Sequence, residues 1–179
     1  MGLCYSLPNQ SLEKATLDTR PEFSLKGVHT YGKILRVYDG DTAWVSVNSP
    51  IATTWRVRLL GIDTEEMRQP KDVENREEKI SLAFAARNRL AQLTTDVHVD
   101  LDCRLKSKDW NELIGKNRKL IWVEFGDSDK YGRPLVQLFE RKNGIQSVNS
   151  MLVAEHYALE YDGKTKSSVT DQVTSASRM

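Results

Sequence analysis

Residues 38–66 read YDGDTAWVSVNSPIATTWRVRLLGIDTEE, and the rest of the chain is organised around them. Two strand-like runs in this stretch are bordered by acidic residues, Asp39 and Asp41 at the first and Asp63 and Glu66 at the second. If the fold brings these carboxylates together, they repel one another and need a cation, or their pKa values rise until they take up protons. A hard divalent ion with oxygen ligands meets that need, and Ca²⁺ fits best.

An arginine in the second run, Arg58, adds a planar fork of donors that suits a phosphate group. A metal ion, carboxylates and arginine are together the parts needed to hydrolyse a phosphodiester. Each motif has a plainer reading when it is taken singly. Asp39 and Asp41 also suit an ordinary Asp-Gly turn, and Arg58 also suits a solvated strand face.

The length and composition describe a soluble globular protein. The chain has 179 residues, of which 39% are hydrophobic and 28% charged, enough for one domain with flexible ends. Its net charge of +1 gives no overall attraction for nucleic acid, so any steering must come from a local patch. No apolar run is long enough to cross a membrane. Two cysteines far apart in the sequence predict neither a disulfide framework nor a zinc site, and favour a reducing compartment.

The first residues, MGLCYS, fit the pattern for N-myristoylation, with Gly2 exposed once Met1 is removed and Ser6 at the favoured position. A single acyl chain anchors a protein only marginally, and Cys4 offers a palmitoylation site as the second signal. Residues 1–26 are therefore predicted to be a flexible tether that holds the protein at the cytoplasmic face of a membrane. The alternative is an ordinary soluble N-terminus, in which case the protein is cytoplasmic.

Periodicity predicts the regular elements. The first three strands are predicted at Lys33–Tyr38, Thr42–Asn48 and Thr53–Leu60, a fourth at Val97–Leu101 and a fifth at Leu135–Glu140. In the third strand Trp55, Val57 and Leu59 share one face, and Arg58 points to the other. Helices are predicted at Arg76–Leu93, after a capping box that begins at Asn75, and at Val148–His156. Residues 165–179 are rich in Ser and Thr and are predicted to be disordered.

Three motifs in order give a more specific resemblance. They are Asp39-Gly40-Asp41-Thr42, then Arg58-Leu59-Leu60 leading to Asp63-Thr64 and Glu66, and finally Asp129-Lys130-Tyr131-Gly132-Arg133. From about Lys33 to Tyr161 the chain resembles the staphylococcal nuclease (thermonuclease-like) family. The resemblance implies an α+β fold, a five-stranded OB-type β-barrel with packed helices. The nuclease domain would occupy residues 27–163, followed by a disordered tail over residues 164–179.

The same resemblance implies a role for each matched residue. Asp41 and Asp63 correspond to carboxylate ligands of Ca²⁺, and Thr64 to a ligand through its backbone carbonyl. Asp39 corresponds to an acid close to the metal. Three further positions correspond to catalytic residues: Glu66 to the general base, and Arg58 and Arg133 to the pair that binds the phosphate. One departure is Glu65, which stands where the family commonly has proline and which loosens the turn before Glu66.

A basic stretch with an aromatic residue follows the predicted fourth strand. Together with Tyr131, it gives the possible nucleic-acid contacts Lys106, Lys108, Trp110, Lys116, Arg118 and Tyr131. The stretch also suits an anionic membrane surface. The plainest alternative is a solvated loop whose Trp110 packs into the domain.

These observations favour a Ca²⁺-dependent nuclease that cleaves DNA and RNA with little sequence preference and prefers single strands. One alternative is a non-catalytic nucleic-acid-binding OB-type module tethered to a membrane, because such domains often bind without cutting. Another is a lipid-anchored scaffold, which leaves the acids and arginines unexplained. No protein partner is predicted.

Overall fold

The computed structural model describes residues 12–16, 18–19, 22–48 and 50–161. Gly2, Cys4 and the tail beyond residue 161 lie outside the described residues. The strands are β1 His29–Val37, β2 Thr42–Val47, β3 Thr53–Leu59, β4 Ile62–Asp63, β5 Ile121–Ser128, β6 Pro134–Phe139 and β7 Leu159–Glu160. The helices are α2 Arg76–Thr94, α3 Ser107–Gly115 and α4 Val148–Ala154.

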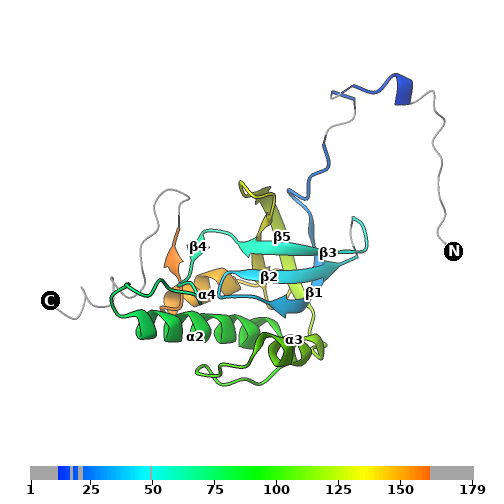
Figure 1. Ribbon diagram of the computed structural model, residues 1–179. Helices are drawn as coiled ribbons and strands as arrows, with labels where there is room; N and C mark the ends of the chain where they lie inside the picture. Colours follow the sequence, from blue (N-terminus) through cyan, green and yellow to red (C-terminus); the bar gives the residue numbers. More distant parts are fainter. Residues whose placement is uncertain (1–11, 17, 20–21, 49, 162–179) are drawn as a thin grey trace.

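Five strands close into a barrel in the order β1-β2-β3-β6-β5, and α2, α3 and α4 pack beside it (Figure 1). Neighbouring strands are antiparallel except β3 and β6, which run parallel with Arg58 opposite Leu135. A two-stranded ribbon of β4 and β7 lies beside the barrel, on the side where α2 begins. This is the predicted α+β fold with a five-stranded OB-type barrel.

The barrel interior is filled by alternate residues of each strand. Ala43, Val45 and Val47 of β2 are buried, and so are Val57 and Leu59 of β3, with Trp55 packed against them. Trp55, Val57 and Leu59 therefore share one face, as predicted, and the structure shows that this face is the inward one and that Arg58 lies on the outward face. Leu25 is also buried in this core, two residues before the predicted start of the domain.

The predicted fourth strand at Val97–Leu101 is wrong, because this segment is irregular and the corresponding barrel strand is β5, Ile121–Ser128. Side chains of α2 take up the carbonyl groups that a neighbouring strand would otherwise bind. The Asn88 amide donates to the carbonyls of Asp100 and Leu101 at 3.0 and 2.9 Å, and the Gln92 amide donates to that of Val99 at 2.7 Å. The alternation of apolar residues here reflects half-burial against the helix and not a sheet.

The helix predicted at Arg76–Leu93 is confirmed as α2, but its capping box is not. Asn75 has a φ of 53° and makes no capping hydrogen bond through its side chain. The second predicted helix is shorter than expected, since α4 ends at Ala154 and His156 has a φ of 62°. None of the helices among the described residues is long and apolar enough to span a membrane.

Candidate active site

Two turns that carry acidic residues are packed directly against each other. A Cβ atom added to Gly40 would lie 2.7 Å from the Cβ of Ala86 in α2 and 2.8 Å from Cγ2 of Thr64. Because real side chains do not approach so closely, only glycine fits at this position. The turn between β1 and β2 therefore lies against the Asp63–Thr64 segment, as the sequence motifs predicted.

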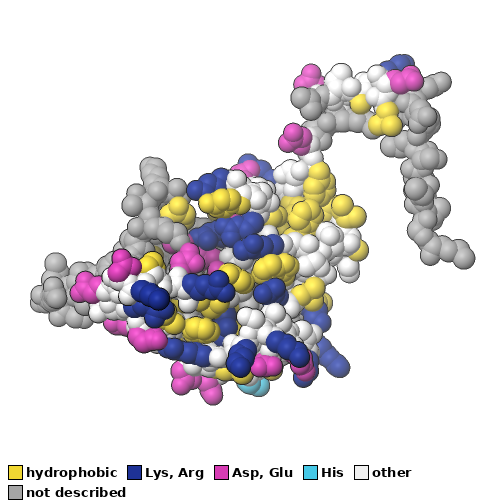
Figure 2. All heavy atoms as spheres, viewed as in Figure 1, with side chains coloured by type: hydrophobic (Ala, Val, Ile, Leu, Met, Phe, Trp, Pro, Cys, Tyr) yellow, Lys and Arg dark blue, Asp and Glu magenta, His cyan; other side chains and the backbone are white. Residues whose placement is uncertain are grey.

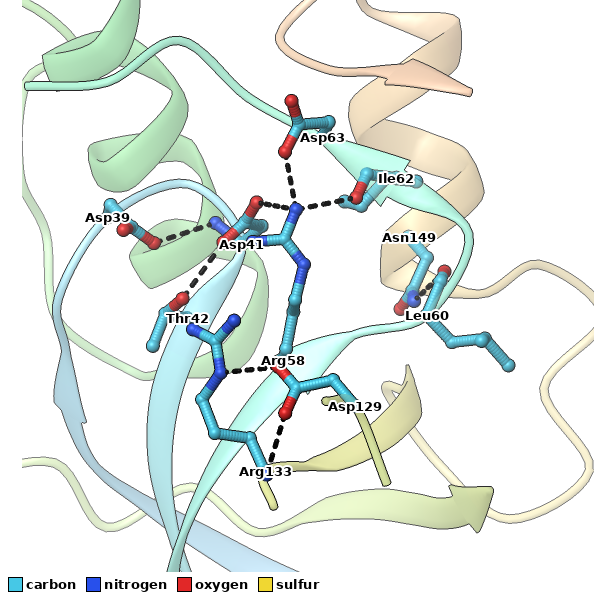
Figure 3. Close-up of polar contacts among 10 residues, drawn as sticks. All are labelled: Asp39, Asp41, Thr42, Arg58, Leu60, Ile62, Asp63, Asp129, Arg133 and Asn149. Atoms are coloured by element: carbon cyan, nitrogen blue, oxygen red, sulfur yellow. Dashed lines mark hydrogen bonds and ion pairs between the residues drawn. The ribbon is translucent and has the colours of Figure 1, made fainter. Parts of the chain in front are cut away.

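Arg58 binds both acidic turns from the outward face of β3 (Figure 3). Its Nη2 lies 2.8 Å from Oδ2 of Asp41 and also donates to Oδ1 of Asp63. The Ile62 carbonyl lies 3.4 Å from the same nitrogen. Burial works to lower the pKa of Arg58, but the nearby carboxylates, Asp41 first, outweigh it and raise that pKa. The guanidinium thus stays charged and holds Asp41 and Asp63 at one point.

The environment of Asp41 opposes its negative charge. The residue is 3% exposed, and burial together with the charge of Asp39 raises the pKa of Asp41 to about 7, although Arg58 favours the ionised form. Thr42 Oγ1 donates to Asp41 Oδ1 at 2.9 Å, and the Asp41 backbone N–H donates to Asp39 Oδ1 at 3.2 Å. A single guanidinium does not neutralise this cluster, so the site has capacity for a further positive charge.

Asp39 links the cluster to the predicted general base. Burial raises the pKa of Asp39, and the negative charge of Glu66 raises it further. Glu66 is exposed and stands two residues after Thr64. Its carboxylate is therefore within electrostatic range of the cluster and open to solvent.

Gln69 closes the loop that carries Glu66. Its side-chain amide donates to Glu65 Oε2 at 3.2 Å and to the Glu66 carbonyl at 3.0 Å. The Gln69 carbonyl in turn accepts a hydrogen bond from Nε of Arg76, at the start of α2, at 3.3 Å. The Glu65 carboxylate thus helps to close this turn through a hydrogen bond from Gln69. A proline at the same position would stiffen the turn with its ring instead. Sequence reasoning missed Gln69, because an isolated amide gives no motif.

The second predicted phosphate-binding residue, Arg133, is held by Asp129. Nε of Arg133 donates to Asp129 Oδ2 at 2.7 Å, and the Arg133 backbone N–H donates to Asp129 Oδ1 at 2.9 Å. Gly132 between them has a φ of 76°, as expected for a residue that must turn the chain here. The parallel register of β3 and β6 pairs Leu135 with Arg58, so Arg133 lies two residues before the partner of Arg58. Figure 3 shows both arginines on the same side of the strands.

A buried asparagine of α4 fixes this parallel pair of strands, and it was not foreseen from the sequence. Asn149 Nδ2 donates to the carbonyls of Leu60 and Val136 at 2.9 and 3.0 Å, and its Oδ1 accepts from the Leu138 N–H at 3.2 Å. One side chain therefore joins the end of β3 to β6 and sets the relative position of the two arginines.

The carboxylate oxygens of Asp41 and Asp63 fit a calcium ion in their chemistry, and in this structure they bind Arg58. Within the described residues, His, Cys, Asp and Glu side chains do not come together in a group of three arranged around a metal position. The Arg58 guanidinium lies where the Asp41 and Asp63 carboxylates converge. Both carboxylates are buried, at 3% and 6% exposure, and the oxygen ligands are of the kind that Ca²⁺ prefers.

The predicted nucleic-acid contacts divide into two groups. Trp110 is 2% exposed and its indole N–H donates to the Val37 carbonyl at 2.7 Å. Its possible role in base stacking is therefore wrong, and the alternative that Trp110 packs into the domain is confirmed. It lies in α3, within a stretch that the sequence suggested was a loop. The remaining side chains are exposed: Lys106, Lys108, Lys116, Arg118 and Tyr131.

Comparison with known proteins leaves the class of this protein open. No family model matches the chain. The chain is 33% identical over 137 residues to an uncharacterized protein of Methanocaldococcus jannaschii. The match covers 74% of this chain and 60% of that protein, so the chain spans less than two thirds of the relative.

Proposed function

We propose that this protein is a Ca²⁺-dependent nuclease that hydrolyses the phosphodiester bonds of DNA and RNA. The observation that carries the proposal is the convergence of the buried Asp41 and Asp63 carboxylates on one Arg58 nitrogen. A structural ion pair needs only one carboxylate, and a second buried acid raises the electrostatic cost of the cluster. Such an arrangement is typical of a functional site.

Each residue of the proposed site has a separate role in the reaction. When bound by Asp41, Asp63 and the Thr64 carbonyl, Ca²⁺ would supply a Lewis acid for the phosphate. Arg58 and Arg133 bind the nonbridging oxygens and stabilise the charge that grows on them in the transition state. Glu66, exposed and beside the cluster, removes a proton from the attacking water. These contacts are made to the phosphate backbone of the nucleic acid, which is the same for every base sequence, so little sequence preference is expected.

The direct test is digestion of single-stranded DNA and of RNA with Ca²⁺ and then with chelator. Wild type should cleave both only with Ca²⁺. Glu66→Gln should lose most of this activity, whereas Glu74→Gln, an exposed acid a few residues further along, should keep it. Equal cleavage by wild type and Glu66→Gln would show that Glu66 is not the general base. Binding without cleavage in Ca²⁺ would favour the non-catalytic OB-type module.

We also propose that the N-terminus carries myristate on Gly2 and palmitate on Cys4, and that these chains hold the protein at the cytoplasmic face of a membrane, with the plasma membrane as the expected one. The support is the sequence pattern alone. Mass spectrometry of the protein from its native cell tests it, and an unmodified Gly2 would contradict it.

A further inference from the structure

The outward face of β1, β2 and β3 carries a ladder of arginine and aromatic side chains that the catalytic proposal does not use. Arg36 of β1 pairs across the strands with Trp44 of β2, which in turn pairs with Arg56 of β3. Tyr38 stands two residues after Arg36 along the chain. We call Arg36, Tyr38, Trp44 and Arg56 the arginine–aromatic ladder.

The ladder is held together by contacts between cations and rings. The guanidinium carbons of Arg36 and Arg56 lie 4.8 and 5.2 Å from the centre of the Trp44 ring. The same two groups lie 5.9 and 5.6 Å from the ring of Tyr38. Trp44 and Tyr38 also meet edge to face, with ring centres 6.3 Å apart. The two arginines are therefore arranged by aromatic rings and not by acids.

The charges of the ladder are not neutralised within the described residues. The ion pairs of the described residues include neither Arg36 nor Arg56, and Nε of Arg36 is buried without a hydrogen-bond partner. Arg56 is exposed, and Tyr38 is 40% exposed. Figure 2 shows one face of the molecule, on which Lys and Arg side chains gather over the barrel strands with acidic side chains beside them. The ladder is thus a surface with free positive charge and an accessible ring.

The ladder is continuous with the candidate active site. On β3 Arg56 stands two residues before Arg58, on the same outward face. On β2 the register pairs Trp44 with Arg56 and Thr42 with Arg58, so the ladder and the site occupy adjacent rows of the sheet. A chain bound along the ladder would lead directly to the acidic cluster.

We propose that the arginine–aromatic ladder is the binding track for a single-stranded nucleic acid, which it delivers to the cluster of Asp41, Asp63 and Arg58. This inference rests on the proposed nuclease function and adds the surface that binds the substrate and leads it to the site. Phosphates bind the two guanidinium groups, and an unpaired base stacks on Tyr38. A duplex keeps its bases stacked inside and would use only the arginines.

Binding is measured with the full chain in chelator, so that the result does not depend on cleavage. The probe is a fluorescent single-stranded oligonucleotide, with its duplex for comparison. Arg36→Gln/Arg56→Gln should weaken single-strand binding at least tenfold and reduce the salt slope by about 1.4, at about 0.7 for each phosphate contact on a single strand. The control Arg141→Gln/Lys142→Gln removes the same charge from the exposed turn after β6 and should bind as wild type.

Tyr38 tests the stacking contact separately. Tyr38→Ala should weaken single-strand binding about fivefold or more, and Tyr38→Phe, which keeps the ring, should restore it. With Ca²⁺, the double arginine variant should show a raised KM for long single strands and unchanged hydrolysis of a dinucleotide.

Wild-type affinity in the double arginine variant would overturn the proposed binding track. Equal affinity of the wild-type protein for the single strand and for the duplex would overturn it as well. A fall in melting temperature without a change in binding would also overturn it, because the ladder would then be structural. Absence of Ca²⁺-dependent cleavage by wild type would end the proposed function, while the binding series in chelator would still decide the track.

Discussion

Nη2 of Arg58 lies 2.8 Å from Oδ2 of Asp41, and this contact joins the residue proposed to bind the phosphate to a residue proposed to bind the metal. The guanidinium occupies the position on which the acidic side chains converge. A divalent cation at the same position would release Arg58 toward substrate. Both the stability and the activity of the protein should reflect this exchange.

Calcium should stabilise the folded protein, because it binds the assembled acids and not the unfolded chain. At a concentration one hundred times the dissociation constant the gain is about 2.7 kcal/mol. Thermal melting with Ca²⁺ and with chelator measures it. Asp63→Asn should lose the shift, and Glu74→Asn should keep it. An unchanged melting temperature for wild type at millimolar Ca²⁺ would argue against a metal site here.

Arg58→Gln should destabilise the metal-free protein by about 3 kcal/mol, because it leaves the buried Asp41 and Asp63 without their cation. The same variant should gain more from Ca²⁺ than wild type does. Urea unfolding in chelator and in Ca²⁺ gives both values. The exposed Arg141→Gln is the control, and a similar loss in both variants would show that Arg58 has no special role.

The stability of the metal-free protein should fall as pH rises from about 4 to about 7. Burial and Asp39 raise the pKa of Asp41 from 3.8 to about 7, so the folded state holds a proton that the unfolded chain has released. This contribution is complete below the unfolded pKa and is lost as pH rises through about 7. Relative to Asp41→Asn, wild type should lose at most about 1.4 kcal/mol per pH unit. Parallel pH profiles for the two proteins would show that Asp41 does not titrate in this range.

Gly40→Ala should destabilise the protein by about 1–3 kcal/mol and reduce cleavage, because the new methyl group meets Ala86 and Thr64 at 2.7 and 2.8 Å. Gly115→Ala is the matched control, since a Cβ there meets nothing within 4 Å. Chemical unfolding of the two variants makes the comparison. Equal stability would mean that the two acidic turns are not in contact.

Gln69→Ala should lower kcat with little change in melting temperature, since it frees the loop that carries Glu66 without opening the core. The double variant Glu65→Pro/Gln69→Ala should recover part of the loss, because the ring stiffens the same turn. Steady-state kinetics on single-stranded DNA decide this, and unchanged kcat in Gln69→Ala would show that the amide does not position the base.

The sequence by itself determined four of the five barrel strands, β1, β2, β3 and β6, and the order of the acidic and basic motifs, but it did not reveal β5. Side chains alternate along any strand, so parity alone places Val57 and Leu59 on one face of β3 and Arg58 on the other. Which of the two faces looks into the barrel was not readable from parity. The helix α2 was equally readable from its apolar spacing. Such features depend on near neighbours in the chain.

The elements and contacts that depend on residues distant in the sequence were decided only by the tertiary structure. The alternation at residues 97–101 predicted a strand that the structure does not have, because Asn88 and Gln92 of α2 bind the carbonyl groups of this segment. Trp110 became a buried donor to Val37, 73 positions away, and not a surface ring. The close packing of Gly40 against Ala86 and the joining of β3 to β6 by Asn149 likewise follow from how the chain folds back on itself. The local sequence pattern does not indicate these contacts.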